Sequence, residues 1–128
     1  PELPATTVVY SCYQNMFNGC TSLTTAPELP ATTLAQGCYT YMFTGCSSLT
    51  TAPELPATSL ATDCYTYMFR NTLITSITIK ATENVTAANL SNWVSGVPSP
   101  GTFNCIEGVE YPSGTSGIPE GWTVNYIS

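Results

Sequence analysis

A 26-residue repeat is the feature of this chain that most constrains its fold. Residues 1–26 (PELPATTVVYSCYQNMFNGCTSLTTA) recur as residues 27–52 with 18 of the 26 positions identical, and a third copy opens at Pro53 and diverges after Phe69. A unit of this length cannot bury its own apolar face, so it stacks on its neighbours. The sequence therefore predicts a solenoid. Its expected divisions are 1–26, 27–52 and 53–69 onward, followed by a last rung and C-terminal cap at 70–128.

Apolar residues recur four positions apart within each copy. In the second copy they are Leu34, Cys38 and Met42, and Tyr39 and Phe43 follow the last two by one position. On a helix such residues form one apolar stripe, so we expect the Met-Phe pair of every copy to be buried. The predicted helices span about 8–17, 34–43 and 60–69, and Gly19, Gly45 and Asn71 stand where each of them would end.

The remainder of the repeat, SLTTAPELPA, predicts a short extended segment and a proline-fixed turn. Strand, turn and helix within about 26 residues is the pattern of a leucine-rich repeat. The expected fold class is therefore an α/β leucine-rich-repeat solenoid, with short strands and one short helix per repeat and a C-terminal capping unit. In that unit the expected elements are strands at 74–82, 101–106 and 121–128 and a helix at 86–97.

The composition excludes several classes of function. Eight acidic residues stand against only Arg70 and Lys80, for a net charge of −6, so the chain lacks the basic surface that binds nucleic acid. No apolar run is long enough for a membrane span. The chain has no histidine, which excludes a Ser-His-Asp triad, a Cys-His pair and a typical zinc site. We therefore expect a protein that is not an enzyme and needs no metal or cofactor.

The cysteines allow either disulfides or buried thiols, and they are Cys12, Cys20, Cys38, Cys46, Cys64 and Cys105. On a helix, residues eight apart are separated by about 12 Å, and packed helices lie about 8–10 Å apart. A disulfide needs Cα atoms within about 7 Å. This spacing favours thiols that pack as small apolar residues, and we expect Cys12, Cys38 and Cys64 to be reduced and unreactive.

Three sets of polar residues recur in register and are the candidate ligand-binding residues. The carboxylates allow a Ca²⁺ site, a glycosidase acid and base, or simple exposure to water. The tyrosines either contact a sugar or a protein partner or pack on each other. The threonines would contribute to the same binding surface on the strand side. The candidates are Glu2, Glu28, Glu54, Thr24, Thr25, Thr50, Thr51, Tyr41 and Tyr67.

The run MFxGCxSLT, found at 16–24 and 42–50, resembles the BspA-like, treponemal-type leucine-rich repeats of bacterial surface proteins. The segments LITSITIK (73–80) and GTSGIPEGWTV (114–124) are similar to a strand and to the closing segment of such proteins. The resemblance implies a bacterial protein that is secreted or exposed at the cell surface.

Together these features predict a non-enzymatic binding or adhesion module that presents its repeat surface to a host or microbial surface protein, or to a glycan. Two alternatives stay open, a carbohydrate-binding module and a structural spacer in a larger surface protein. Pro1 opens a repeat with no cap before it, so we expect further repeats or a cap upstream, preceded by an export signal. An uncapped first rung would also allow self-association.

Overall fold

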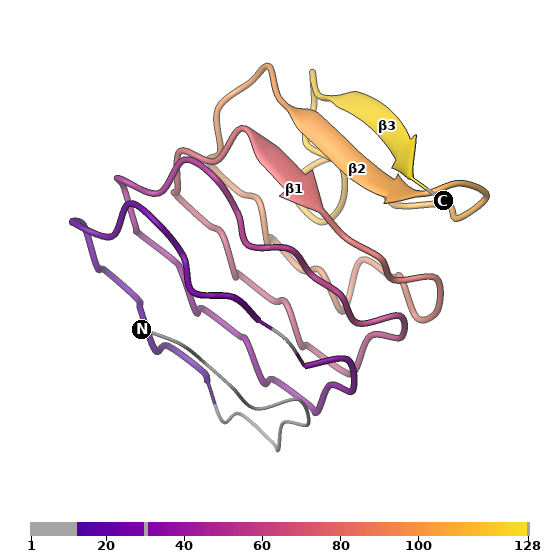
Figure 1. Ribbon diagram of the computed structural model, residues 1–128, viewed down its shortest axis with the longest axis horizontal. Coiled ribbons are helices and arrows are strands. Elements are labelled where there is room, and N and C mark those ends of the chain that lie inside the picture. The colour runs from indigo at the N-terminus through magenta and orange to yellow at the C-terminus, as the bar shows by residue number, and fades with distance from the viewer. Residues whose placement is uncertain (1–12, 30, 128) are drawn as a thin grey trace.

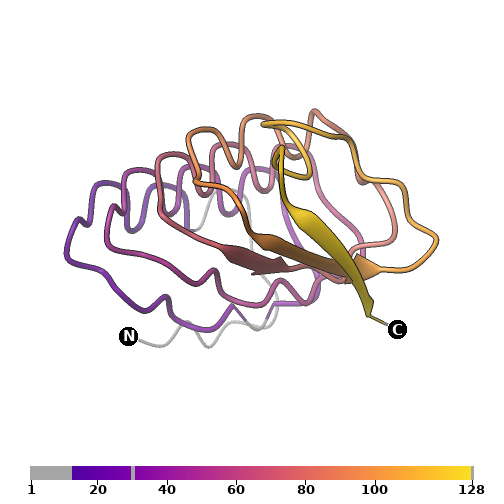
Figure 2. The same ribbon diagram turned by 90° about the horizontal axis from the view of Figure 1, so that it is seen from above.

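The structure is a computed structural model and describes residues 13–29 and 31–127. The chain winds as a stack of coils, each called a rung below, with the sheet near the C-terminal end of the stack (Figure 1). Seen from above, the rungs lie side by side, with undulating turns along one side and the strands along the other (Figure 2).

The described residues contain no helix, so the predicted α/β leucine-rich-repeat solenoid with one helix per repeat is wrong. The four predicted helices are runs of consecutive turns, called turn segments below. The turn segments span 13–19, 36–45, 62–71 and 87–96. Residues 8–12 of the first predicted helix lie outside the described residues.

Backbone N–H groups in a turn segment alternate between two kinds of acceptor. The N–H of Thr40 donates to the carbonyl of Gly37 in the same rung at 3.2 Å, whereas the N–H of Tyr41 donates to Thr66 in the next rung at 3.0 Å. In the same way, the N–H of Asn15 donates to the carbonyl of Thr40 at 3.0 Å. In the first three turn segments the alternation satisfies the backbone donors without the i to i−4 bonds of a helix, and the fourth begins with a single such bond, from the N–H of Leu90 to the carbonyl of Thr86 at 3.2 Å.

In the first three turn segments every fourth residue has a positive φ, which a right-handed helix excludes. In the second rung they are Gly37 (64°), Tyr41 (59°) and Gly45 (77°). Gly45 thus adopts the left-handed conformation expected of it, but as one of a series and not as the end of a helix. Four residues of an α-helix overshoot one turn by about 40°. A strict spacing of four therefore suits a repeating turn better than a helix.

Three parallel strands form one sheet in the order β1-β2-β3. They are β1 (Ser76–Thr78), β2 (Thr102–Ile106) and β3 (Thr123–Ile127). They confirm the strands predicted at 74–82, 101–106 and 121–128. Ile77 lies opposite Phe103 and Phe103 lies opposite Val124, so the apolar residues of the three strands share one face.

The short extended segment expected in SLTTAPELPA forms no strand in the described residues of 22–31 or 48–57, and this also contradicts the leucine-rich-repeat prediction. Pro27, Pro53 and Pro56 have no N–H to donate, so a continuous ladder of hydrogen bonds cannot form there. The third copy contributes only isolated bridges, one of which joins Leu55 to Ile79.

Aromatic side chains of successive rungs stack in columns inside the coil. The rings of Phe17 and Phe43 lie 5.5 Å apart and those of Phe43 and Phe69 lie 5.7 Å apart, with interplanar angles of 2° and 1°. A tyrosine column runs beside them, and both columns reach Trp93 in the fourth turn segment. Stacking of equivalent residues therefore builds the core, as the repeat requires.

The predicted burial of the Met-Phe pair is confirmed for the second and third copies. Met42, Phe43, Met68 and Phe69 are fully buried. Met16 is 49% exposed, which contradicts the prediction for the first copy. The reason is its position, because the first turn segment has a described neighbour on one side only.

Candidate functional site

Two members of the glutamate column lie at a hollow between the second and third rungs. The hollow has a volume of about 290 Å³ and is lined by Ala26, Pro27, Glu28, Leu29, Pro53, Glu54 and Pro56. Glu28 and Glu54 are exposed, whereas Leu29 is buried. The hollow therefore combines an apolar wall with carboxylates that face water. Glu2, the remaining member of the predicted column, lies outside the described residues.

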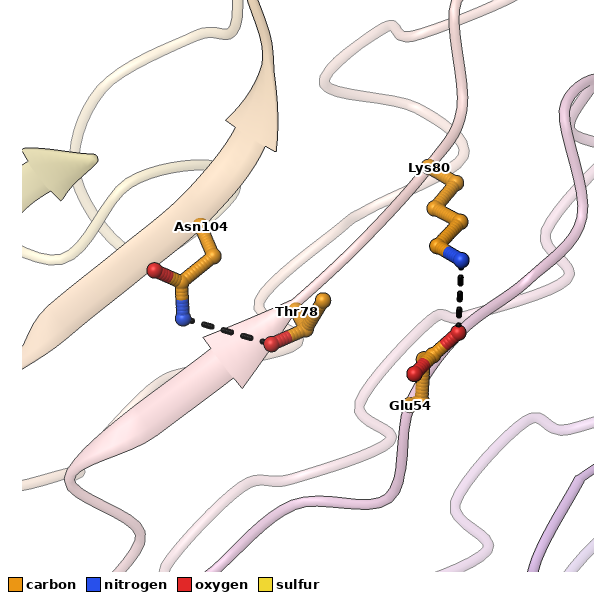
Figure 3. A network of polar contacts seen from close by, with 4 residues as sticks. All are labelled: Glu54, Thr78, Lys80 and Asn104. Atoms are coloured by element: carbon orange, nitrogen blue, oxygen red, sulfur yellow. Dashed lines mark hydrogen bonds and ion pairs between the residues drawn. The ribbon is translucent and has the colours of Figure 1, made fainter. Parts of the chain in front are cut away.

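Lys80 extends the glutamate column onto the next rung with the opposite charge. Its Nζ lies 2.9 Å from Oε1 of Glu54, and the two side chains are 44% and 56% exposed (Figure 3). A pair this exposed contributes only about 0–1 kcal/mol to stability. The pair matters for function because it shows that a carboxylate of the column can bind a lysine ammonium group. The sequence prediction missed Lys80, although it stands one repeat length after Glu54.

The chemistry open to the glutamates is hydrogen bonding and ion pairing at the surface. Among residues 13–29 and 31–127, no group of three or more His, Cys, Asp or Glu side chains could hold a metal ion. A glycosidase pair needs two carboxylates in contrasting environments, whereas Glu28 and Glu54 are both exposed and occupy equivalent positions of a repeat.

The four candidate threonines are exposed and precede the hollow along the chain. They are Thr24, Thr25, Thr50 and Thr51. The N–H of Thr75 in the following rung donates to the carbonyl of Thr50 at 3.0 Å, which fixes the backbone of the second pair. The hydroxyls of Thr50 and Thr51 therefore stand on a backbone that is bonded to the following rung, just before the proline turn that begins at Pro53.

A row of amides on the sheet was not predicted. Nδ2 of Asn125 donates to Oδ1 of Asn104 at 2.9 Å, and Nδ2 of Asn104 donates to Oγ1 of Thr78 at 3.2 Å. Figure 3 shows the second of these bonds beside the ion pair of Lys80 and Glu54. The row and the ion pair make the strand side a polar surface with fixed hydrogen-bonding groups.

The candidate tyrosines pack on each other, which was one of the two interpretations of their spacing. The rings of Tyr41 and Tyr67 lie 4.8 Å apart at an interplanar angle of 6°, and Cζ of Arg70 lies 5.5 Å from the Tyr67 ring centre. Nδ2 of Asn92 donates to the Tyr67 hydroxyl at 3.4 Å. Both rings are half-buried, so little of either face is left for a ligand.

The predicted burial of the cysteine column is confirmed for Cys38 and Cys64, which are fully buried, while Cys12 lies outside the described residues. The structure has free thiols at Cys20, Cys46, Cys64 and Cys105. The argument from helix spacing against disulfides is wrong, however, because the described residues form no helix. Backbone segments joined by hydrogen bonds lie only about 5 Å apart, which is within reach of a disulfide.

The Cys64 thiol should make stability depend on pH. Burial raises its pKa from about 9 to about 12, because the thiolate would lose its contact with water. As pH rises from about 9 to about 12, the unfolded chain releases this proton while the folded chain keeps it, so the free energy of unfolding falls. The slope from one such group approaches about 1.4 kcal/mol per pH unit.

Urea unfolding across this pH range should therefore show a shallower decline for Cys64→Ala than for the native chain. A thiol reagent should label Cys64 only after unfolding. If the free energy of unfolding fell equally steeply with pH in Cys64→Ala and in the native chain, the attribution of this pH dependence to the Cys64 thiol would be wrong.

Comparisons of the chain with protein-family models, curated proteins and solved structures found no match. Within the part of the chain that the structure describes, no helix has the length and hydrophobicity that crossing a membrane requires.

Proposed function

We propose that this chain is a non-enzymatic binding module of a bacterial surface or secreted protein, and that it presents its strand side to a protein partner. The similarity of MFxGCxSLT to BspA-like repeats supports the cellular location. The similarity does not support a leucine-rich-repeat fold, because residues 13–29 and 31–127 contain no helix. The binding role is argued from the hollow beside the proline turns.

The observation that carries the proposal is the pairing of an apolar wall with two exposed carboxylates. A Lys or Arg side chain combines an apolar stem with a cationic head. The stem would lie against Pro27, Pro53 and Leu29, and the head would reach Glu28 or Glu54. The partner is therefore a protein segment that inserts a basic side chain, in the manner in which Lys80 already meets Glu54.

A titration with a short peptide tests this arrangement directly. The probe is acetyl-Ala-Lys-Ala-amide, compared with the peptide that carries norleucine, which keeps the four-carbon stem and lacks the ammonium group, and the readout is the amide chemical shifts of the folded chain. We expect shifts at the amides of Ala26, Glu28, Leu29, Glu54 and Leu55 with the lysine peptide, and weak binding of about millimolar affinity, since a single side chain is engaged. Norleucine lacks the charge and should bind at least about fivefold more weakly.

The matched control separates the hollow from the overall acidity of the chain. Glu28→Gln with Glu54→Gln should weaken binding at least about fivefold, whereas Glu107→Gln with Glu110→Gln removes the same charge elsewhere and should change it less than about twofold. Equal losses in the two variants would show non-specific attraction and contradict the proposal. If the chain binds to a glycan array and does not bind the peptide, the carbohydrate-binding alternative is favoured. If it binds neither, the structural spacer is favoured.

A further inference from the structure

Cys20 and Cys46 occupy equivalent positions in consecutive repeats and meet at the surface end of two turn segments. Just before them, the N–H of Gly19 donates to the carbonyl of Thr44 at 2.8 Å. A Cβ atom built on Gly45 would lie only 3.6 Å from Cα of Gly19. The two rungs are therefore in van der Waals contact at the residues that precede both cysteines.

The two cysteines also converge on one oxygen atom. The backbone N–H of Cys20 and the Sγ of Cys46 each lie 3.0 Å from the carbonyl oxygen of Phe17. Burial raises the pKa of Cys46, and both the backbone N–H and the thiol of Cys20 contribute to its electrostatic environment. Geometry and electrostatics thus agree that the two residues are neighbours.

We propose that Cys20 and Cys46 are a site of oxidative modification, at which a disulfide links the first rung to the second. Hydrogen-bonded backbone segments lie about 5 Å apart, inside the range of about 4.4–6.8 Å between Cα atoms that a disulfide spans. Cys20 is exposed and Cys46 is buried beneath it. An oxidant in solution therefore meets Cys20 first, and Cys46 resolves the product. This site does not depend on the proposed binding function.

The reaction is thiol–disulfide exchange with a small-molecule disulfide such as oxidised glutathione. The Cys20 thiolate attacks one sulfur of the oxidant, the oxidant's S–S bond breaks, and one glutathione thiolate leaves. Cys46 then loses its proton to solvent, and its thiolate attacks Sγ of Cys20 and releases the second glutathione. Two protein thiols are oxidised to one disulfide, and one molecule of the oxidant is reduced to two thiols.

The other cysteine column supplies an internal control. Cys38 and Cys64 are also one repeat length apart, but both are fully buried. No small disulfide can reach either of them without unfolding. The proposal therefore predicts that oxidation of the native chain is confined to Cys20 and Cys46.

The test is to incubate the folded native chain, and the same chain with Cys12→Ser, with oxidised glutathione and to map the products by mass spectrometry. We expect both chains to lose about 2 Da, and peptide mapping to join Cys20 to Cys46. Cys46→Ser should stop at the mixed disulfide, with about 305 Da added to Cys20. Cys20→Ser should leave Cys46 unmodified. The bridged chain should also unfold at a higher temperature than the reduced chain, because the crosslink restricts the unfolded state.

Three results would overturn the proposal. One is a native chain that retains glutathione on Cys20, which would show that Cys46 cannot reach it. Another is a covalent dimer through Cys20, and the third is a bridge that involves Cys38 or Cys64 in the folded chain. None of these measurements uses the peptide, so a result that overturns the disulfide proposal leaves the proposed binding function untouched.

Discussion

Replacing Phe43 with alanine is expected to lower the free energy of unfolding by about 3–5 kcal/mol. Phe43 is fully buried and its ring stacks between those of Phe17 and Phe69, at 5.5 and 5.7 Å. Removing it leaves a cavity in the middle of the column and deprives both neighbours of a stacking partner. Chemical denaturation of the two chains, monitored by tyrosine and tryptophan fluorescence, measures the loss.

Phe17→Ala is the matched control, because it makes the same chemical change at the end of the described column. Phe17 is only partly buried and has one described ring neighbour, so we expect a loss of about 1–2 kcal/mol. Equal losses at the two positions, or a loss below about 1 kcal/mol for Phe43→Ala, would show that the column does not form the core.

The columns could be predicted from the sequence, but the backbone between them could not. Equivalent residues of stacked repeats come together whatever conformation the repeat adopts, so the alignment of Phe43 with Phe17 and Phe69 follows from the repeat, and the apolar character of these side chains favours their burial. A spacing of four residues fits a helix closely enough to suggest one. The distinguishing signal was the left-handed position shared by Gly37, Tyr41 and Gly45. Tyrosine rarely adopts a positive φ, so the series could not be recognised by residue type.

The polar residues on the strand side could be predicted only in part, because only some of them follow the repeat. The glutamate column follows from the repeat, and continuing it by one repeat length would have found Lys80. The amide row depends on the register of the sheet. Thr102 pairs with Ser76 and with Thr123, which lie at unequal distances along the chain, so no period in the sequence places Asn104 beside Asn125.

Trp93→Ala is expected to have an effect as large as that of Phe43→Ala, about 4–5 kcal/mol. Trp93 is fully buried and ends both aromatic columns, with ring distances of 5.9 Å to Tyr65 and 6.0 Å to Phe69. Its Nε1–H also donates to the carbonyl of Gly117 at 2.9 Å, which ties the segment 113–118 to the fourth turn segment. The substitution removes ring packing and a buried hydrogen bond together, and urea denaturation measures the sum.

Trp93→Phe keeps one aromatic ring but removes the donor and part of the ring volume, so it should cost less than Trp93→Ala. We expect a loss of at least about 1–3 kcal/mol, the penalty of leaving the Gly117 carbonyl buried without its partner. The N–H of Val94 donates to the carbonyl of Thr115 at 3.3 Å, so hydrogen exchange of the Val94 amide reports whether 113–118 stays in place. Faster exchange in both variants is the expected result. If exchange is unchanged in Trp93→Ala, the segment is held by other contacts, and the role assigned to the indole donor is wrong.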